Sequence, residues 1–108
     1  MQVRITERHC QVPQDTRDRA EKRVAGLSKY SPRASSADVV FTEEKVNRGV
    51  EVIIHVDGGE PVVASVQDTE FRAALDKVVD RLGRRLRKQR ERRTNHQAPS
   101  RRDFVGSE

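Results

Sequence analysis

Alternating apolar and polar residues between positions 37 and 66 constrain the fold of this chain more than any other feature. Val50, Val52 and Ile54 occupy every second position and therefore share one face of an extended strand, with Glu51 and His55 on the other. Two flanking segments repeat the pattern, with the apolar positions Ala37, Val39, Phe41 and Val62, Ala64, Val66. The pattern predicts three strands of one sheet that has a single apolar face.

Two turn signals separate these strands. The run 57–60, Asp-Gly-Gly-Glu, is a strong hairpin signal because both central glycines tolerate a positive φ. The run 47–49, Asn-Arg-Gly, predicts an earlier turn. Pro61 has no N–H to donate, so the last strand is expected to lie at a sheet edge or to begin just after this residue.

A strand and a helix are expected before this region. Residues 2–8 alternate, with Val3 and Ile5 on one face. Pro13 suits the first turn of a helix, where its missing N–H costs nothing, and Pro32 ends that helix. The apolar residues between the two prolines have helical spacing: Ala20, Val24, Leu27 and Tyr30.

A second helix follows the sheet region, and Asp68 is expected to cap its start. Its apolar stripe consists of Phe71, Leu75, Val78, Val79, Leu82 and Leu86. Helix-forming residues continue to Arg93, so the last two turns are expected to extend past the sheet and carry only charge. Residues 94–108 are expected to form a flexible polar tail after a domain spanning residues 1–93.

The element order β-α-β-β-β-α predicts the fold class. Two helices suffice to cover the apolar face of a four-stranded sheet. We therefore expect an α+β fold of two layers, a four-stranded sheet with two helices packed on one face.

Positive charge is concentrated in the second helix. Residues 81–93 contain eight basic residues and one acid, a net charge of +7, whereas the whole chain has a net charge of +5. The remainder therefore sums to 5 − 7 = −2. Cations this crowded repel one another, which favours a polyanionic partner over a merely solvated helix face. Nucleic acid is preferred to a membrane because no apolar face continues beyond Leu86.

The residues give no support to a metal, cofactor or small-molecule site. Cys10 is the only cysteine, so neither an internal disulfide nor a cysteine-based metal site is predicted. The three histidines lack metal-ligand spacing: His9, His55 and His96. The chain has no apolar run of signal-peptide or membrane-spanning length, which predicts a cytoplasmic protein.

An enzyme is not predicted either. Four acids of the strand region are the nearest approach to a catalytic pair: Glu43, Glu44, Glu51 and Asp57. The alternation places Glu51 and Asp57 opposite the valines, on a face that is expected to be solvated.

The basic helix has the geometry of a phosphate-binding surface. Five cations at steps of three and four form a stripe along one side: Arg81, Arg84, Arg85, Lys88 and Arg92. Arg87 and Arg90 widen the stripe. Arginine binds phosphate oxygens bidentately, and the helix spaces its turns at about 5–6 Å. The first helix adds Arg17, Lys22, Arg23 and Lys29, which join the stripe if the helices pack side by side.

Aromatic residues are scarce near this surface. Phe41 and Phe71 are expected in the core, and only Tyr30 is a candidate for stacking on a base. The surface is therefore expected to recognise RNA shape and backbone rather than the sequence of a single strand.

Several motifs between His55 and His96 occur together in a known family. They are the hairpin glycines 58–59, the Ala64-x-Val66 strand, the helix start at Asp68, the run 71–76 (Phe-x-Ala-Ala-Leu-Asp), the triplet Asp80-Arg81-Leu82 and the basic repeat from Arg84. The opening strand and Leu27-Ser28-Lys29-Tyr30 also match. On these motifs, about residues 1–96 resemble the ribosome hibernation-promoting factors, also called the protein Y or sigma-54 modulation family.

The resemblance implies the β-α-β-β-β-α fold and binding to the small ribosomal subunit. Such proteins occupy the decoding channel between head and body, overlap the mRNA and the A- and P-site tRNAs, and block translation in stationary or stressed cells. Their two helices contact rRNA through basic residues. The rRNA-binding positions that the resemblance implies are Lys22, Lys29, Arg81, Arg84, Arg85, Lys88, Arg90 and Arg92, and the charge pattern of the helices adds Arg23 and Arg87.

The chain departs from the family pattern in places. Ser31 and Pro32 stand where the family usually has an aromatic residue and an acid, so the end of the first helix is expected to differ. Arginine is used where lysine or glutamine is common, which is expected to raise phosphate affinity. Long members carry a second domain that dimerises ribosomes, for which this chain has no room. It is expected to be a short form or the N-terminal domain of a long one, and its effect on ribosome dimers stays open.

Two alternatives from other classes remain. One is a regulator that binds an acidic protein such as a transcription factor. The other is a general binder of double-stranded RNA, because the β-β-β-α order loosely resembles such domains.

Overall fold

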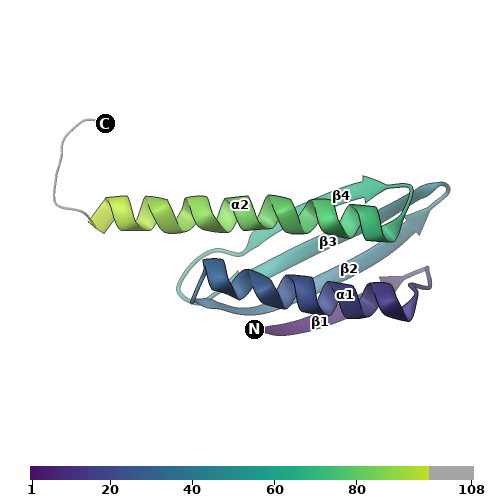
Figure 1. Cartoon of the computed structure of the whole chain (residues 1–108), viewed down its shortest axis with the longest axis horizontal. Coiled ribbons are helices and arrows are strands. Elements are labelled where there is room, and N and C mark those ends of the chain that lie inside the picture. The colour runs from purple at the N-terminus through teal and green to yellow at the C-terminus, as the bar shows by residue number, and fades with distance from the viewer. Residues whose placement is uncertain (98–108) are drawn as a thin grey trace.

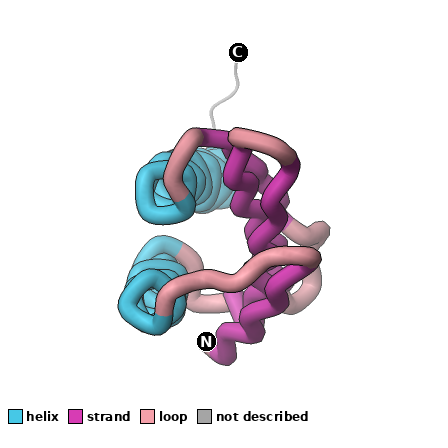
Figure 2. The backbone as a smooth tube through the Cα atoms, turned by 90° about the vertical axis from the view of Figure 1, so that its right-hand side faces the viewer, coloured by secondary structure: helices cyan, strands magenta, loops and turns pink. Residues whose placement is uncertain are grey.

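A four-stranded sheet with two helices on one face forms the two layers of the protein (Figures 1 and 2). The computed structural model describes the backbone of residues 1–97 and the side chains of residues 1–91. The elements in chain order are β1 (Gln2–Arg8), α1 (Gln14–Ala25), the 3-10 helix η1 (Gly26–Tyr30), β2 (Ala34–Glu44), β3 (Asn47–Val56), β4 (Val62–Asp68) and α2 (Phe71–Gln97). The predicted fold class and element order are confirmed.

The sheet is mixed, with the spatial order β1-β2-β3-β4. β1 runs parallel to β2, with Val3 opposite Ala37 and Ile5 opposite Val39. A parallel pair needs a crossover connection, and α1 with η1 provides it. The pairs β2–β3 and β3–β4 are antiparallel hairpins, which leaves β4 as an edge strand as Pro61 predicted.

The core lies between the sheet and the helices. Phe41, Val52 and Ile54 are fully buried, as the alternation predicted. Leu75 and Leu82 are buried beneath α2, and the buried stripe of that helix ends at Leu86. Beyond this point α2 runs past the sheet, as Figure 1 shows, so the division of the helix into a packed part and a projecting part is confirmed.

The two hairpins differ in how well the sequence predicted them. Gly58 has a φ of 73°, and the N–H of Gly59 donates to the carbonyl of Val56 at 3.1 Å, which confirms the turn at residues 57–60. The predicted turn at residues 47–49 is wrong, because these residues open β3 and the chain reverses at Lys45 and Val46. Lys45 takes the positive φ of 57° that the turn requires.

Gly49 has a packing role instead of a turn role. A Cβ atom at this position would lie 2.7 Å from Oγ1 of Thr42 on the neighbouring strand, closer than side-chain atoms approach. Glycine inside a strand often marks such a close approach.

The first helical segment changes character at Gly26. The α-helical hydrogen bonding ends at Ala25, and the chain continues as a 3-10 helix to Tyr30, whereas one uninterrupted helix was predicted. Glycine has a low helix propensity, and Pro32 follows closely, so the last turn tightens. Ala20, Val24 and Leu27 are still buried against the sheet.

Both ends of α2 differ from the prediction. Asp68 does not cap the helix, because the carbonyl that accepts the first helical hydrogen bond, from the N–H of Ala74, belongs to Glu70. Asp68 ends β4, and its carboxylate accepts hydrogen bonds from the Thr69 N–H and from Nζ of Lys77, both at 2.6 Å. The hydrogen bond from Lys77 lowers the pKa of Asp68.

At its other end α2 continues to Gln97, beyond the predicted end at Arg93. The sequence has no helix-breaking residue before Pro99, and proline disfavours helical backbone at the residue before it. The expected mobility of residues 98–108 lies outside the described residues. Within residues 1–97, neither helix combines the length and the apolar character needed to cross a bilayer.

Candidate nucleic-acid interface

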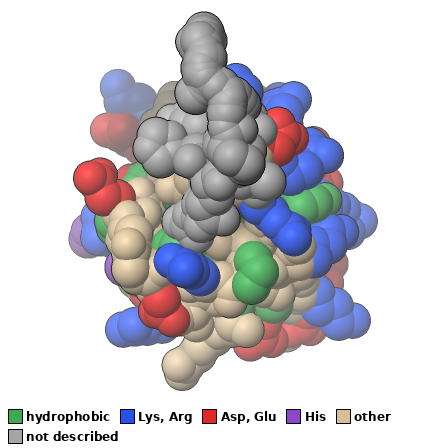
Figure 3. Space-filling view, turned by 90° about the vertical axis from the view of Figure 1, so that its left-hand side faces the viewer, with side chains coloured by type: hydrophobic (Ala, Val, Ile, Leu, Met, Phe, Trp, Pro, Cys, Tyr) green, Lys and Arg blue, Asp and Glu red, His purple; other side chains and the backbone are tan. Residues whose placement is uncertain are grey.

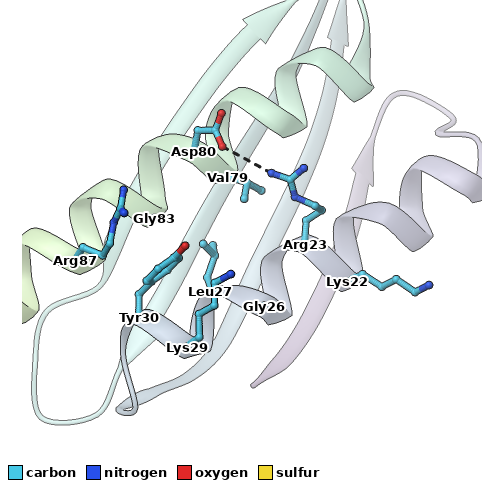
Figure 4. A pocket seen from close by; sticks show the side chains of 10 residues that line it. All are labelled: Lys22, Arg23, Gly26, Leu27, Lys29, Tyr30, Val79, Asp80, Gly83 and Arg87. Atoms are coloured by element: carbon cyan, nitrogen blue, oxygen red, sulfur yellow. Dashed lines mark ion pairs between the residues drawn. The ribbon is translucent and has the colours of Figure 1, made fainter.

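The two helices of the layer lie side by side (Figure 2), and a groove lies between η1 and α2, with its lining side chains drawn in Figure 4. Its volume is about 310 Å³, and its walls come from both helical segments. The charged side chains lining it are Lys22, Arg23, Lys29, Arg87 and Asp80. The structure therefore joins cations of the first helical segment with one cation of α2, as predicted for helices packed side by side.

Two acids of α2 hold the helices together at one side of this groove. Arg19 donates to both carboxylate oxygens of Asp76, at 3.0 and 3.2 Å. The guanidinium of Arg23 lies 3.5 Å from Asp76 and 3.7 Å from Asp80, the second contact being drawn in Figure 4. The hydrogen bond from Arg19 lowers the pKa of Asp76, which keeps the carboxylate charged.

These contacts change the expected role of Arg23. Its charge is balanced by Asp76 and Asp80, so less of it is available to a phosphate than the sequence suggested. Asp76 and Asp80 were expected only as members of the family motifs, and their pairing with α1 was not predicted. Their spacing of four residues on α2 matches the spacing of Arg19 and Arg23 on α1, and this is the signal that would have paired them.

Tyr30 lies where η1 meets α2. Nζ of Lys29 is 5.1 Å from the centroid of its ring, and the guanidinium carbon of Arg87 is 5.3 Å from it, both within range of a cation–π interaction. Gly83 of α2 lies against the ring, and a Cβ atom there would make an ordinary contact of 3.5 Å with Cε2 of Tyr30. The ring therefore brings a cation of each helical segment to the groove.

The opposite side of α2 faces the free edge of β4. Nη1 of Arg81 donates to the carbonyl of Ser65 at 3.3 Å, and Nη1 of Arg85 donates to the carbonyl of Val63. Arg81 and Arg85 are four residues apart on the helix, a rise of about 6 Å, and Val63 and Ser65 are two residues apart on the strand, about 6.6 Å. The spacing of the two arginines therefore matches the spacing of the two carbonyls that accept from them. The sequence placed both arginines in the RNA-binding stripe but did not predict that the sheet would hold them.

The remaining predicted residues surround the outer surface of α2. Arg84 and Lys88 are exposed, as are Lys22 and Lys29 on the other helical segment. Arg90 is exposed as well, whereas the side chain of Arg92 lies outside the described residues. Figure 3 shows the molecule from the end at which α2 projects past the sheet. In this view the Lys and Arg side chains gather mainly on the side of the helical layer.

The acids and the histidine of the sheet lie on the face opposite the helices. Oδ2 of Asp38 is 2.9 Å from Nε2 of His55, and Oδ1 is 3.1 Å from Nε of Arg4. These polar contacts cross β1, β2 and β3. Among the side chains of residues 1–91, no three of His, Cys, Asp or Glu are grouped to hold a metal ion.

The fold and this surface together define a small α+β domain with a basic helical layer suited to a polyanion. The sigma 54 modulation protein / S30EA ribosomal protein family model matches residues 3–94. The chain belongs to this family.

Individual relatives agree with the family assignment. The chain is 34% identical over 97 residues to the ribosome hibernation promoting factor of Azotobacter vinelandii, covering 90% of each sequence. It is 31% identical over 96 residues to that of Escherichia coli K12, covering 89% of this chain and 100% of the relative.

Two solved structures share the fold. The N-terminal domain of Thermus thermophilus protein Y superimposes with a TM-score of 0.72 at 26% identity, covering 82% of this chain and 99% of that one. A ribosomal subunit interface protein from Coxiella burnetii gives a TM-score of 0.77 at 16% identity, covering 84% and 99%, which supports the fold alone.

Proposed function

We propose that this protein is a cytoplasmic ribosome hibernation factor that binds the small ribosomal subunit in the decoding channel. Bound there, it overlaps the paths of mRNA and of the A- and P-site tRNAs, and it inhibits translation in stressed or stationary cells. The names of its relatives support hibernation, and the family description supports a ribosomal partner.

One observation carries the proposal. Exposed cations of two segments far apart in the sequence gather on one helical layer, with Lys22 and Lys29 on one side of the groove and Arg87 on the other. Arg84 and Lys88 extend this surface along the outside of α2. The neighbouring acids Asp76 and Asp80 are paired with arginines of α1, so they do not cancel this charge.

The predicted residues then divide into three roles. Lys22, Lys29, Arg84, Arg87 and Lys88 contact phosphates directly, because their charged groups are exposed. Arg81 and Arg85 bind phosphate with the donors that the β4 carbonyls leave free, since each guanidinium has five N–H groups. Arg23 orients α1 against α2, and Arg90 and Arg92 extend the contact along the projecting turns.

Co-sedimentation with purified small subunits tests the proposal. The double variant Arg84→Glu, Lys88→Glu is expected to lower affinity at least about tenfold, because two phosphate contacts become repulsions. The control is Arg8→Glu, Arg72→Glu, which makes the same change in net charge at exposed positions away from the groove. Equal loss in both double variants, or none in the first, would overturn the proposal.

Binding measurements with other partners separate the two alternative functions. Capture of an acidic protein that survives nuclease treatment indicates the protein-binding regulator. Equal affinity for arbitrary RNA duplexes and for small subunits indicates a general double-stranded RNA binder. Preference for small subunits over duplexes, lost at high salt, is the outcome that the proposed function requires.

A further inference from the structure

Among the Phe and Tyr side chains of residues 1–91, Tyr30 is the one that is not buried in the core. Phe41 and Phe71 are 0% and 8% exposed and pack against each other edge to face, with ring centroids 5.5 Å apart. Tyr30 is only partly buried and lines the groove between η1 and α2. In RNA-binding proteins, an aromatic ring at a cationic surface can stack on an unpaired base. Binding to phosphates alone does not need such a ring.

The groove has the size and the charge for one nucleotide. Its volume of about 310 Å³ lies at the lower end of small-ligand sites, which are about 300–1,000 Å³. Its four cations exceed its one acid, and that acid, Asp80, is paired with Arg23 at 3.7 Å. Phosphate on such a wall is attracted rather than repelled.

The two cations over the ring are suited to move when a base arrives. Lys29 and Arg87 are both exposed and attach to the ring only through cation–π contacts, at 5.1 and 5.3 Å. Such contacts at exposed sites are weak. Each cation can therefore leave the ring and pair with a phosphate at the groove.

We propose that this groove binds one unpaired nucleotide of RNA, with its base at Tyr30 and its phosphate at Lys29 and Arg87. The inference rests on the proposed function and refines it. The protein then recognises a junction of paired and unpaired RNA, since the outer surface of α2 binds backbone while the groove takes a base. A continuous duplex satisfies only the first of these surfaces.

Base-directed chemical probing of small subunits, at single-nucleotide resolution, tests the groove. We expect the natural protein and Tyr30→Phe to protect at least one unpaired base. Tyr30→Leu is expected to lose this protection and roughly tenfold in affinity, because base stacking on an aromatic ring is lost. The slope of affinity against salt stays unchanged in Tyr30→Leu, since no phosphate contact is removed.

Gly83 provides a second variant that leaves Tyr30 and all charges in place. Gly83→Gln puts a long side chain at the groove wall and is expected to abolish base protection, while removing glycine from a helix favours folding. Gly83→Ala is the matched control, because its Cβ makes only ordinary contacts of 3.5 Å or more with Tyr30 and Leu27. Thermal melting of each variant separates a loss of folding from a loss of binding.

The possible failures are distinguishable. Subunit binding without protection of any unpaired base, or protection that persists in both Tyr30→Leu and Gly83→Gln, overturns the groove inference and leaves the proposed function standing. Failure of the natural protein to bind small subunits overturns the proposed function itself.

Discussion

The guanidinium carbon of Arg87 lies 5.3 Å from the centroid of the Tyr30 ring, joining the basic part of α2 to the end of η1. This contact forms just after the buried stripe of α2 ends at Leu86. Nζ of Lys29 lies 5.1 Å from the centroid of the same ring. Two basic segments that are remote in sequence therefore present one surface.

The carbonyls of β4 give Arg85 a different role from Arg84. Arg85→Lys is expected to weaken small-subunit binding and to lower the melting temperature by a few degrees, because a lysine lacks the fork that reaches both Val63 and a phosphate. Arg84→Lys keeps the charge of an exposed residue and is expected to change little. Binding isotherms and thermal melts of both variants check this, and equal behaviour of the two would contradict it.

Salt dependence is expected to separate the two neighbouring cations of α1. Lys22→Gln removes an exposed charge and is expected to reduce the slope of log affinity against log salt by about 0.7–0.9. Arg23→Gln is expected to reduce it less, because Asp76 and Asp80 already balance the charge of Arg23. Titrations at four or more salt concentrations measure both slopes. A larger effect at Arg23 would show that its ion pairs break on binding.

The ion pair between Arg19 and Asp76 is expected to make stability pH-dependent. The pKa of Asp76 is lowered in the folded protein, mainly by the hydrogen bond from Arg19, whereas unfolded aspartate has a pKa of about 3.9. Its stabilising contribution is therefore fully present above that unfolded value and is lost as the pH falls through the lower folded value.

Urea unfolding across a pH series measures this contribution. Asp76→Asn is expected to be less stable than the natural protein at neutral pH, with a difference that shrinks below about pH 4. Glu21→Gln, which changes an exposed carboxylate of α1, is the control and is expected to show no such convergence. A difference that is constant down to the acid transition would assign the effect of Asp76→Asn to packing.

Gly49 is expected to tolerate no side chain while Thr42 faces it. Gly49→Ala places a Cβ atom 2.7 Å from Oγ1 of Thr42 and is expected to cost about 1–3 kcal/mol of unfolding free energy. Thr42→Ala removes the obstructing oxygen, so the double variant is expected to recover part of the loss. Chemical denaturation of the two single variants and the double variant gives the coupling energy, and simple additivity would contradict the contact.

Local pattern was sufficient for most of the fold. Alternation identified the buried residues Val39, Val52 and Ile54, because a strand presents side chains to its two faces with a period of two. The turn at Gly58 was predicted because its positive φ is a property of the residue itself. The turn at Lys45 was not predicted, because lysine does not prefer a positive φ. The pairing of the neighbouring strands β2 and β3 imposes the positive φ on Lys45.

The sequence by itself determined the element order, the buried stripes and the excess of positive charge in residues 81–93, because each depends on spacing along the chain. Only the tertiary structure decided how that charge is used. Packing α1 and η1 beside α2 balances Arg23 with Asp80 and brings Arg87 to Tyr30, and packing α2 on the sheet holds Arg85 at the edge of β4. These are contacts between distant segments, and their distances follow from the register of the sheet and the crossing of the helices rather than from any local pattern.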